Sequence, residues 1–392
     1  MFKRIIVLIV ICFYMVLTDS SYAVQKKLIE FGRSPETAYM REHIATMEKM
    51  PFDGVVFYAS SSEEPNKVGD FCWKSWGSRT FTKEQMQRAV DNLKNTQFKK
   101  FTDNFLRVCV TPGDVDWFDS FDAVLNNMRV VAWVAKQGGV KGIKFDVEDY
   151  EKPLWDYHRQ RDAKTKSFNE YAAQVRKRGA EVMNAFQEEY PDVIIMLSFG
   201  HSVNYKYGYP GGYNLENPGP NGWPMWSNDP NKLQFFSYGL LSPFIDGMVD
   251  VVNPKVKLID GSEYTYFFIR EREFISARKI FNEKVLPFVA DKEKYLKAFS
   301  LGFGIWMDGY GRDENKDPLL HEPGRWNDHI PTENYWQPAE LQMALTNALK
   351  YTDEYVWLYN EAVPPNFWAE KPNVPPVYIE AIKNARKAGG LD

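Results

Sequence analysis

The sequence predicts an α/β protein, a single (β/α)8 barrel (a TIM barrel) with long, aromatic-rich loops between strands and helices. Strand-like and helix-like segments alternate along the chain of 392 residues, and they form eight strand–helix units between residues 28 and 360. The alternative, a doubly wound sheet, would need a glycine-rich phosphate loop after an early strand, and the sequence has none. Acidic residues recur where the later strands end, which is where barrel enzymes build their active sites. We therefore expect residues 24–392 to form one barrel domain that ends in a proline-rich tail.

Each predicted strand is a short apolar run, bounded by residues that favour turns. The eight runs cover residues 28–31, 53–58, 105–110, 140–145, 193–199, 256–260, 299–307 and 355–359.

The segments between these runs carry helix signals. Thr82 and Gln85 form a capping-box-like start, Gly138-Gly139 supplies a stop, and Pro191 ends the longest segment. Helices are predicted over residues 36–50, 82–100, 121–137, 167–189, 232–251, 268–285 and 338–352, with shorter ones at 292–297 and 377–388.

The N-terminus has the pattern of a signal peptide covering residues 1–23. Lys3 and Arg4 precede an apolar stretch, residues 5–17, that is too short for a comfortable membrane span. Small residues around Ala23 suit cleavage, so the mature chain would begin at Val24; an uncleaved anchor is the alternative. We expect a secreted or periplasmic protein without stable membrane association after cleavage.

Two cysteines would remain in the mature chain, because Cys12 leaves with the signal peptide. Cys72 lies in an aromatic loop and Cys109 in an apolar strand. A disulfide between them is an option, but the pattern favours buried thiols.

The composition favours a carbohydrate partner and argues against nucleic acid. The net charge is −4 and no block of basic residues occurs. Aromatic residues make up 16% of the chain and gather in loops rich in Gly and Pro, such as residues 204–229 with Trp223 and Trp226. Aromatic rings in such loops suit stacking on sugars. The sequence sets no oligomeric state.

The strongest chemical signal is the acidic cluster that closes the fourth strand. Asp146 and Glu148 are two residues apart, so an extended strand directs both side chains to one face, with Cα atoms roughly 7 Å apart. Carboxylates this close resist ionising together, and the pKa of one should rise. An acid that keeps its proton beside an ionised carboxylate is what glycosidic cleavage requires. Lys144, on the same face, should favour the charged form of Asp146.

These patterns predict paired-carboxylate catalysis. Glu148 is the expected general acid, Glu263 after the sixth strand is the expected opposing carboxylate, and Asp146 tunes the pKa of Glu148. Glu361 is the reserve for the second carboxylate. Substrate contacts are predicted for acids and aromatic residues near strand ends and in the loops: Glu30, Tyr150, His201, Trp223, Trp226, Asp260, Trp306, Asp308, Trp357 and Glu361. The structural alternative is a turn residue for Asp260 and Asp308, a solvated side chain for Glu263 and Glu361, and a salt bridge in the barrel mouth for Glu30. For Trp306 and Trp357 it is the core, and for Trp223 and Trp226 a structural loop.

Other chemistries have weaker support. The chain has five His and no HxH or HExxH spacing, so no metal or cofactor is predicted. A metal-dependent hydrolase or lyase that uses His201 with Asp260 or Asp146 is one alternative. A carbohydrate-binding barrel without catalysis is another. No GxSxG nucleophile elbow occurs.

The step Asp146-Val147-Glu148 resembles the Asp-x-Asp-x-Glu strand of chitinase-like glycosidases, in which the last Glu is the acid. Lys144 stands where that family has its first Asp, which argues against its substrate-assisted mechanism here. The mature chain also resembles a group of secreted bacterial barrel proteins, which implies a glycoside hydrolase without naming the sugar. That resemblance rests on Leu28-Ile29-Glu30-Phe31-Gly32, Pro51-Phe52-Asp53-Gly54, Asp146-Val147-Glu148-Asp149-Tyr150, Asp260-Gly261-Ser262-Glu263-Tyr264 and Asp353-Glu354-Tyr355-Val356-Trp357.

Overall fold

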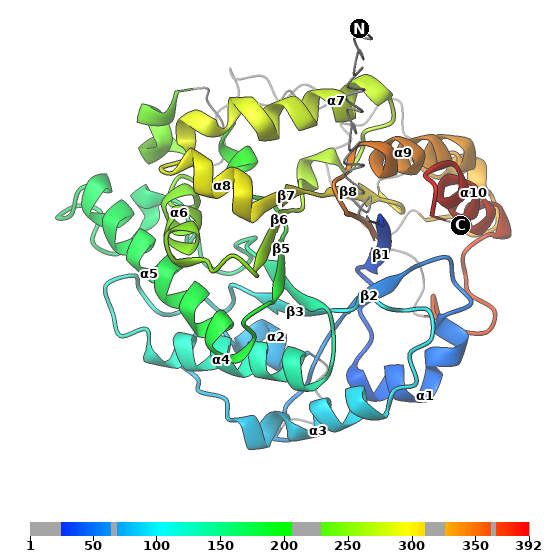
Figure 1. The fold of residues 1–392 in the computed structure, drawn as a ribbon, viewed down its shortest axis with the longest axis horizontal. Helices are drawn as coiled ribbons and strands as arrows, with labels where there is room; N and C mark the ends of the chain where they lie inside the picture. The colour runs from blue at the N-terminus through cyan, green and yellow to red at the C-terminus, as the bar shows by residue number, and fades with distance from the viewer. Residues whose placement is uncertain (1–24, 64–68, 206–228, 310–325, 362–365, 392) are drawn as a thin grey trace, which may run out of the picture.

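A curved sheet of parallel strands stands at the centre of the protein, with helices around it (Figure 1). The computed structural model describes residues 25–63, 69–205, 229–309, 326–361 and 366–391. The order of the strands in the sheet is β7-β6-β5-β4-β3-β2-β1-β9-β8, and every neighbouring pair is parallel. Neighbours in the sheet are thus successive along the chain, except where β1 meets β9. This is the (β/α)8 barrel that the sequence predicts.

The strands lie close to the predicted runs. They are β1 Lys27–Phe31, β2 Gly54–Phe57, β3 Phe105–Cys109, β4 Gly142–Asp146, β5 Ile194–Leu197, β6 Lys257–Asp260, β7 Phe299–Leu301, β8 Phe303–Trp306 and β9 Tyr355–Tyr359.

The predicted seventh strand is two strands, β7 and β8, separated by Gly302. The first half pairs with β6 and the second half pairs with β9, so the two edges of the sheet are joined through a single residue. A Cβ atom at position 302 would lie 3.1 Å from the carbonyl oxygen of Tyr355 and 3.1 Å from a methyl group of Ile259. Glycine therefore lets the chain pass between its two neighbours at the point of closure.

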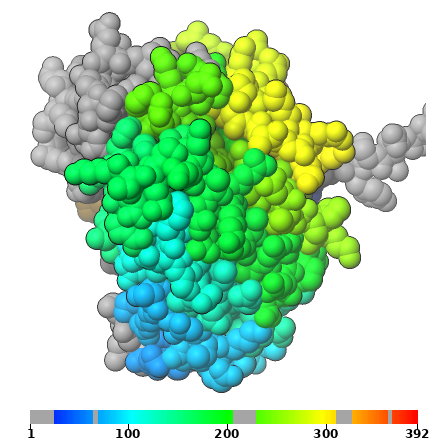
Figure 2. All heavy atoms as spheres, turned by 90° about the vertical axis from the view of Figure 1, so that its left-hand side faces the viewer, coloured from blue at the N-terminus to red at the C-terminus, as the bar shows by residue number. Residues whose placement is uncertain are grey.

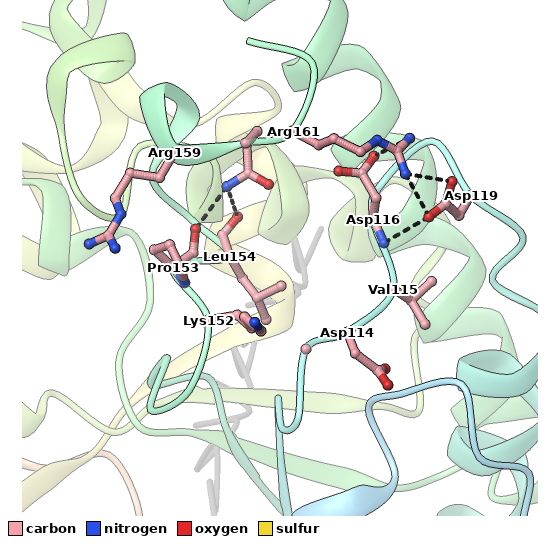
Figure 3. A pocket seen from close by; sticks show the side chains of 11 residues that line it. Asp114, Val115, Asp116, Asp119, Lys152, Pro153, Leu154, Arg159 and Arg161 are labelled. Carbon is pink, nitrogen blue, oxygen red and sulfur yellow. Dashed lines mark hydrogen bonds and ion pairs between the residues drawn. The ribbon is translucent and has the colours of Figure 1, made fainter.

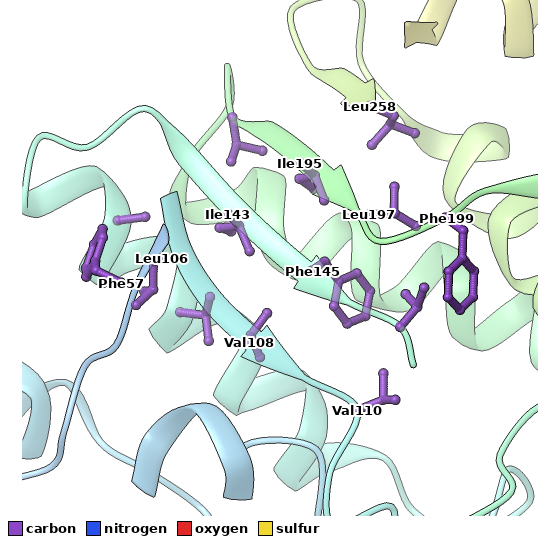
Figure 4. Close-up of a cluster of buried hydrophobic side chains, with 14 of the residues drawn as sticks. Phe57, Leu106, Val108, Val110, Ile143, Phe145, Ile195, Leu197, Phe199 and Leu258 are labelled. Atoms are coloured by element: carbon purple, nitrogen blue, oxygen red, sulfur yellow. The ribbon is translucent and has the colours of Figure 1, made fainter. Parts of the chain in front are cut away.

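The two faces of the sheet bury separate sets of apolar side chains. The inner set, contributed by strands from all around the ring, includes Ile29, Phe31, Val56, Phe105, Met196, Ile259, Tyr355 and Trp357. The outer set packs between the sheet and the helices and includes Leu106, Val108, Ile143, Phe145, Ile195 and Leu197 (Figure 4). Because side chains alternate along a strand, these sets assign each strand residue to the interior of the barrel or to the helical layer.

The helices form the outer layer. They are α1 Thr37–Met47, α2 Asp70–Lys74, α3 Lys83–Asn95, α4 Asp122–Gln137, α5 Phe168–Glu189, α6 Leu241–Val251, α7 Glu271–Lys279, α8 Lys292–Ala298, α9 Pro338–Tyr351 and α10 Pro376–Ala388. The capping box predicted at Thr82 and Gln85 is present at the start of α3. In Figure 2 the colour advances steadily from blue to yellow across this layer, so successive strand–helix units lie side by side.

Two of the predicted helices are each divided into two pieces. The segment 232–251 divides into a 3-10 turn, Pro230–Phe235, and α6, because the chain bends at Gly239, where a Cβ atom would lie 1.9 Å from the carbonyl oxygen of Leu233. The segment 268–285 is α7 followed by a π-helical turn, Ile280–Lys284. The short helix α2 was not predicted.

The C-terminal tail is docked on the barrel through α10. The Arg386 guanidinium donates to both carboxylate oxygens of Asp53, at 2.6 and 3.0 Å, and both side chains are largely buried. Asp53 also accepts a hydrogen bond from the backbone amide of Leu28, at 2.8 Å, so this contact reaches the first strand. The tail thereby supports the edge where the barrel begins.

Three predictions fall on residues outside those that the structure describes. They are the signal peptide, residues 1–23, and the proposed sugar contacts of Trp223 and Trp226. Within the described ranges, no helix has the length and apolar character needed to cross a membrane.

Candidate active site

Strand β4 places a lysine and an aspartate inside the barrel, among mostly apolar side chains. Ile143 and Phe145 belong to the outer core, so Lys144 and Asp146 face inward. Arg107 of β3 is opposite Lys144 in the strand register and faces the same way. Three charged side chains, all 6% exposed or less, thus meet inside the barrel, where a charge must find partners.

Asp146 is held as an anion by three hydrogen-bond donors and by the nearby charge of Lys144. Its carboxylate accepts from Arg107 Nη2 at 2.6 Å, Ser198 Oγ at 2.8 Å and the Tyr150 hydroxyl at 3.1 Å. Burial alone would raise the pKa of Asp146, but Arg107, Lys144 and these hydrogen bonds outweigh burial and lower it. Asp146 is therefore a fixed negative charge at neutral pH.

Lys144 lies beneath this carboxylate and is completely buried. Its ammonium donates to Ser198 Oγ at 2.8 Å and stands 4.8 Å from the centre of the Trp357 ring. Burial lowers the pKa of Lys144 to about 8, although the charges of Asp146 and Glu263 act in the opposite direction. Lys144 is thus a cation that both acids stabilise.

We call Glu148 and Glu263 the carboxyl pair. Glu148 lies two residues beyond the end of β4, and Glu263 lies in the turn after β6. Glu263 begins a 3-10 turn, Glu263–Thr265, that follows Ser262 in the left-handed region with φ of 47°. The Glu263 amide donates to the carbonyl of Ser198 at 3.1 Å, which fixes the turn against the end of β5. Both residues are partly buried.

Burial and neighbouring charges raise the tendency of both members of the carboxyl pair to hold a proton. Burial and then the Asp146 charge raise the pKa of Glu148 to about 7. Burial, followed by the charges of Glu148 and Asp146, raises the pKa of Glu263 well above its usual range. The hydroxyl of Tyr150, beside Glu148, and that of Tyr266, beside Glu263, act on these pKa values in the opposite direction. Near neutral pH the carboxyl pair therefore retains at least one proton.

Aromatic rings form the walls around the carboxyl pair. Tyr266 stacks on Tyr359, with ring centres 5.7 Å apart, and contacts Trp306 at 5.5 Å. On the other side Trp73 of α2 contacts Tyr150 at 5.4 Å, and Tyr150 is 47% exposed. Such surfaces suit the apolar faces of sugar rings.

Two adjoining cavities continue from Tyr150 across the loops after β4 and β3. The first, about 320 Å³, is lined by residues that include Tyr150, Lys152 and Arg159. The second, about 290 Å³, shares Lys152 and Arg159 and extends to Asp114 and Asp119 (Figure 3). Arg161 closes its far side through bonds to Asp119 at 2.9 Å. The hollow surface therefore continues beyond Tyr150, over the loops that follow β4 and β3.

Glu30 and Asp260 do not reach this site, which corrects their predicted role at the barrel mouth. Ile29 and Phe31 face inward, so Glu30 faces the helical layer, where it accepts from Asn360 at 2.7 Å. Ile259 faces inward, so Asp260 turns outward and accepts from Ser202 Oγ at 2.9 Å. Each acid supports the backbone beside its strand end rather than a ligand.

His201 also lies behind the sheet. Its Nδ1 is 3.2 Å from Ser242 Oγ and its Nε2 is 3.6 Å from an oxygen of Asp246, both on α6. The metal-dependent alternative uses His201 with Asp260 or Asp146. Asp146 lies on the opposite face of the sheet, and Asp260, on the same face as His201, is held by Ser202 and by the amide of Ser262. Among the described residues, no group of three His, Cys, Asp or Glu side chains could hold a metal ion.

The remaining predicted contacts are at the rim and on the floor. Asp308, 4% exposed, accepts from Trp306 Nε1 at 2.9 Å and from the Glu361 amide at 2.8 Å, so it joins two loops. Glu361 is exposed on the rim, where its charge acts on Tyr359. Trp357 is fully buried and donates to the carbonyl of Gly261 at 2.8 Å, so it supports Lys144 and the turn before Glu263.

Sequence reasoning missed Arg107, Ser198, Tyr266 and Trp73. Arg107 carried a usable signal, since a charged residue in the middle of Phe105-Leu106-Arg107-Val108-Cys109 repeats the pattern of Lys144 in β4. The two positions pair directly in the barrel. Trp73 and Tyr266 reach the site from loops, and local sequence does not indicate where such residues point.

Comparisons with known proteins leave the activity open. No protein-family model and no curated protein matches the chain. Similar solved structures include an endocellulase from Pyrococcus horikoshii, at 10% identity and TM-score 0.44, over 94% of this chain and 92% of that one. They also include an exo-β-1,4-mannosidase from an Opitutaceae bacterium (12%, 0.44, 92% and 59%) and a sugar phosphate isomerase/epimerase from Parabacteroides distasonis (10%, 0.40, 94% and 97%). At such values these likenesses concern the fold and carry no argument about the reaction.

One prediction follows from the buried position of His201. Burial lowers its pKa to about 4, whereas an unfolded histidine titrates near 6.5. Between these values the unfolded state binds more protons, so this residue should cost up to about 3 kcal/mol of folding stability as the pH falls from 6.5 to 4. In urea unfolding at pH 7 and pH 4.5, His201→Asn should lose less stability than the wild type. The exposed His329→Asn serves as control, and equal losses in wild type and His201→Asn would contradict the assignment.

Proposed function

We propose that this protein is a secreted glycoside hydrolase that cleaves O-glycosidic bonds in a polysaccharide or oligosaccharide. The observation that carries the proposal is the carboxyl pair: two electrostatically coupled glutamates, both with raised pKa values, among aromatic side chains. Glycosidic cleavage by two carboxyl groups requires that one hold a proton while the other is charged. A coupled pair that shares one proton near neutral pH supplies that state.

We assign Glu148 as the proton donor. Burial, and then the charge of Asp146 at the end of β4, raise the pKa of Glu148 to about 7 and favour its protonated form. Burial and the charges of Glu148 and Asp146 raise the pKa of Glu263, and Lys144 acts against them, toward the charged form. In its charged form Glu263 serves as nucleophile or as base for a water molecule. After the leaving group has taken the proton from Glu148, the newly formed carboxylate can accept one from water.

The other charged residues act through these two acids. Arg107 and Ser198 keep Asp146 ionised and in place, so that its field on Glu148 is constant. Tyr266 hydrogen-bonds to Glu263 and orients its carboxyl group, while the Tyr150 hydroxyl, which donates to Asp146, lies beside Glu148. The cavities beside Tyr150 provide room for sugar units beyond the one that reacts, which supports a substrate made of several sugars.

A panel of polysaccharides tests the proposal when hydrolysis and binding are measured on the same samples. We expect new reducing ends from at least one polysaccharide, and we expect the rate to survive a chelator. Binding without any release of reducing ends would instead favour a carbohydrate-binding barrel. Activity that disappears with the chelator and returns with a metal ion would favour a metal-dependent enzyme.

The pH profile should depend on Asp146. Activity of the wild type should fall above about pH 7 as Glu148 loses its proton. Asp146→Asn removes the negative charge that raises this pKa and leaves Arg107 and Lys144 nearby, so the alkaline limb of kcat/KM should move to lower pH. The control is Asp192→Asn, whose exposed residue precedes β5 and pairs with Lys136. An alkaline limb that stays in place in Asp146→Asn would show that the two carboxyl groups are not coupled.

A further inference from the structure

The two cysteines expected in the mature chain lie side by side next to the candidate active site. Cys72 on α2 and Cys109 at the end of β3 are 1% and 0% exposed, and their sulfur atoms are 3.3 Å apart. The Cys109 sulfur is also 3.8 Å from an oxygen of Asp146. The third cysteine of the chain, Cys12, belongs to the segment predicted to be removed.

We propose that Cys72 and Cys109 are joined by a disulfide bond in the mature protein, which ties α2 to the barrel wall beside Asp146. A bond of about 2.05 Å requires the sulfurs to approach by little more than an ångström from their present separation, within reach of small side-chain rotations. The proposal is independent of the proposed hydrolase activity. It does use the prediction that the chain is exported, because disulfides persist in oxidising compartments.

The bond would form by exchange with an oxidised disulfide, R–S–S–R, of a thiol oxidoreductase or of a small thiol. The Cys72 thiolate attacks one sulfur of R–S–S–R, which gives a mixed disulfide and one R–S⁻. The Cys109 thiolate then attacks the Cys72 sulfur and releases the second R–S⁻. The two protons lost by the cysteines end on the two released thiols, so two cysteine thiols are oxidised and one external disulfide is reduced.

Burial sets the time at which this exchange takes place. Burial, and then the hydrogen bond with Cys72, raises the pKa of Cys109, so the folded protein contains little of its thiolate. Neither sulfur is accessible once α2 covers the end of β3. The bond should therefore form during folding, and in the native state it should resist reductants.

The disulfide would reinforce a contact that hydrogen bonds already make. Thr111 Oγ1 donates to the carbonyl of Trp73 at 2.9 Å, and the Trp76 amide donates to the carbonyl of Thr111 at 3.0 Å. The residue beside Cys72 is Trp73, whose ring stands 4.8 Å from the Arg107 guanidinium and 5.4 Å from Tyr150. The bond would thus hold one aromatic wall of the cleft at a fixed distance from Asp146.

Peptide mapping of the wild-type protein tests the proposal without any variant. The full-length chain is produced with its own leader, recovered from the oxidising compartment, denatured and treated with iodoacetamide without reductant. We expect no alkylation at Cys72 or Cys109, a cross-linked peptide containing both, and a mass about 2 Da below that of the reduced chain. Full alkylation of both cysteines would overturn the proposal.

Thermal unfolding provides a second test. The cross-link closes a loop between cysteines 37 positions apart, and a loop of this size should raise Tm by about 5 °C in a chain of this length. Wild type that is unfolded with a reductant and refolded in its presence should lose this amount, whereas Cys72→Ser should show the same Tm with and without reductant. A wild-type Tm that stays the same after unfolding and refolding in the presence of reductant would contradict the proposal.

Discussion

Glu148→Gln is expected to lower turnover of an unactivated glycan by a factor on the order of 10² or more, because general acid catalysis typically contributes that much. The loss should be much smaller for an aryl glycoside with a nitrophenolate leaving group, since that group departs without a proton. The fold should be retained, because the amide has nearly the shape of the carboxyl group. Removing one of two coupled acids also relieves their mutual repulsion.

The measurement is kcat on both substrates, compared with the same measurement on Glu263→Gln. Glu263 contacts the reacting sugar in either mechanism, so its variant should lose activity on both substrates alike. Glu293→Gln, an exposed acid on α8 that pairs with Lys297, is the control and should be unaffected. If Glu148→Gln cleaves the unactivated glycan at the wild-type rate, Glu148 is not the proton donor.

Arg107→Met should have the largest effect on stability, a loss of about 3–5 kcal/mol in the free energy of unfolding. The side chain is 6% exposed and bonds to Asp146 at 2.6 Å, so its removal leaves a buried carboxylate short of its main counter-charge. The pKa of Asp146 should then rise, and its effect on Glu148 should weaken. Urea unfolding measures the loss.

A double variant separates the cost of an unpaired charge from the value of the ion pair itself. Arg107→Met combined with Asp146→Leu removes both charges and should recover part of the stability lost by Arg107→Met alone. The surface variant Arg161→Met, which also loses acidic partners, should change stability little. An Arg107→Met protein as stable as the wild type would show that the ion pair is not needed to bury Asp146.

The barrel was predictable from the alternation of short apolar runs with helical segments, and most element boundaries agree within a few residues. The exception at closure has a physical cause. Residues 299–307 are one apolar run, but the first part pairs with β6 and the second with β9, and a change of partner leaves little mark on local sequence. Gly302 was the sign of it, as a glycine inside a strand pattern often marks a close approach of another backbone.

The sequence indicated where the predicted site residues lie along the strands but not in which direction each side chain points. Strands of a parallel barrel are buried on both faces, so their sequences do not alternate between polar and apolar residues and do not reveal which set faces inward. A shift of one residue reverses every side chain. For that reason Glu30 and Asp260 lie behind the sheet, while Asp146, which also ends a strand, lies inside.

The coupling of Glu148 with Glu263 depends on contacts that no local pattern contains. Glu263 reaches the mouth through the turn at Ser262 and through the Ser198 carbonyl, which belongs to the neighbouring strand unit. Its pKa depends on Glu148, Asp146 and Lys144, more than a hundred positions away in the chain. The position of Glu263 after the sixth strand predicted it as the partner of Glu148. The contacts described above explain why the charge of Glu148 acts on the pKa of Glu263.

The most direct test of the central claim measures reducing-end release from a cleaved polysaccharide by the wild type, Glu148→Gln, Glu263→Gln and the variant with both changes. If the carboxyl pair acts as one unit, each single variant should lose a factor on the order of 10² or more. The double variant should then be little worse than the poorer single one. A double variant that releases reducing ends at the wild-type rate would show that the carboxyl pair does not perform the cleavage.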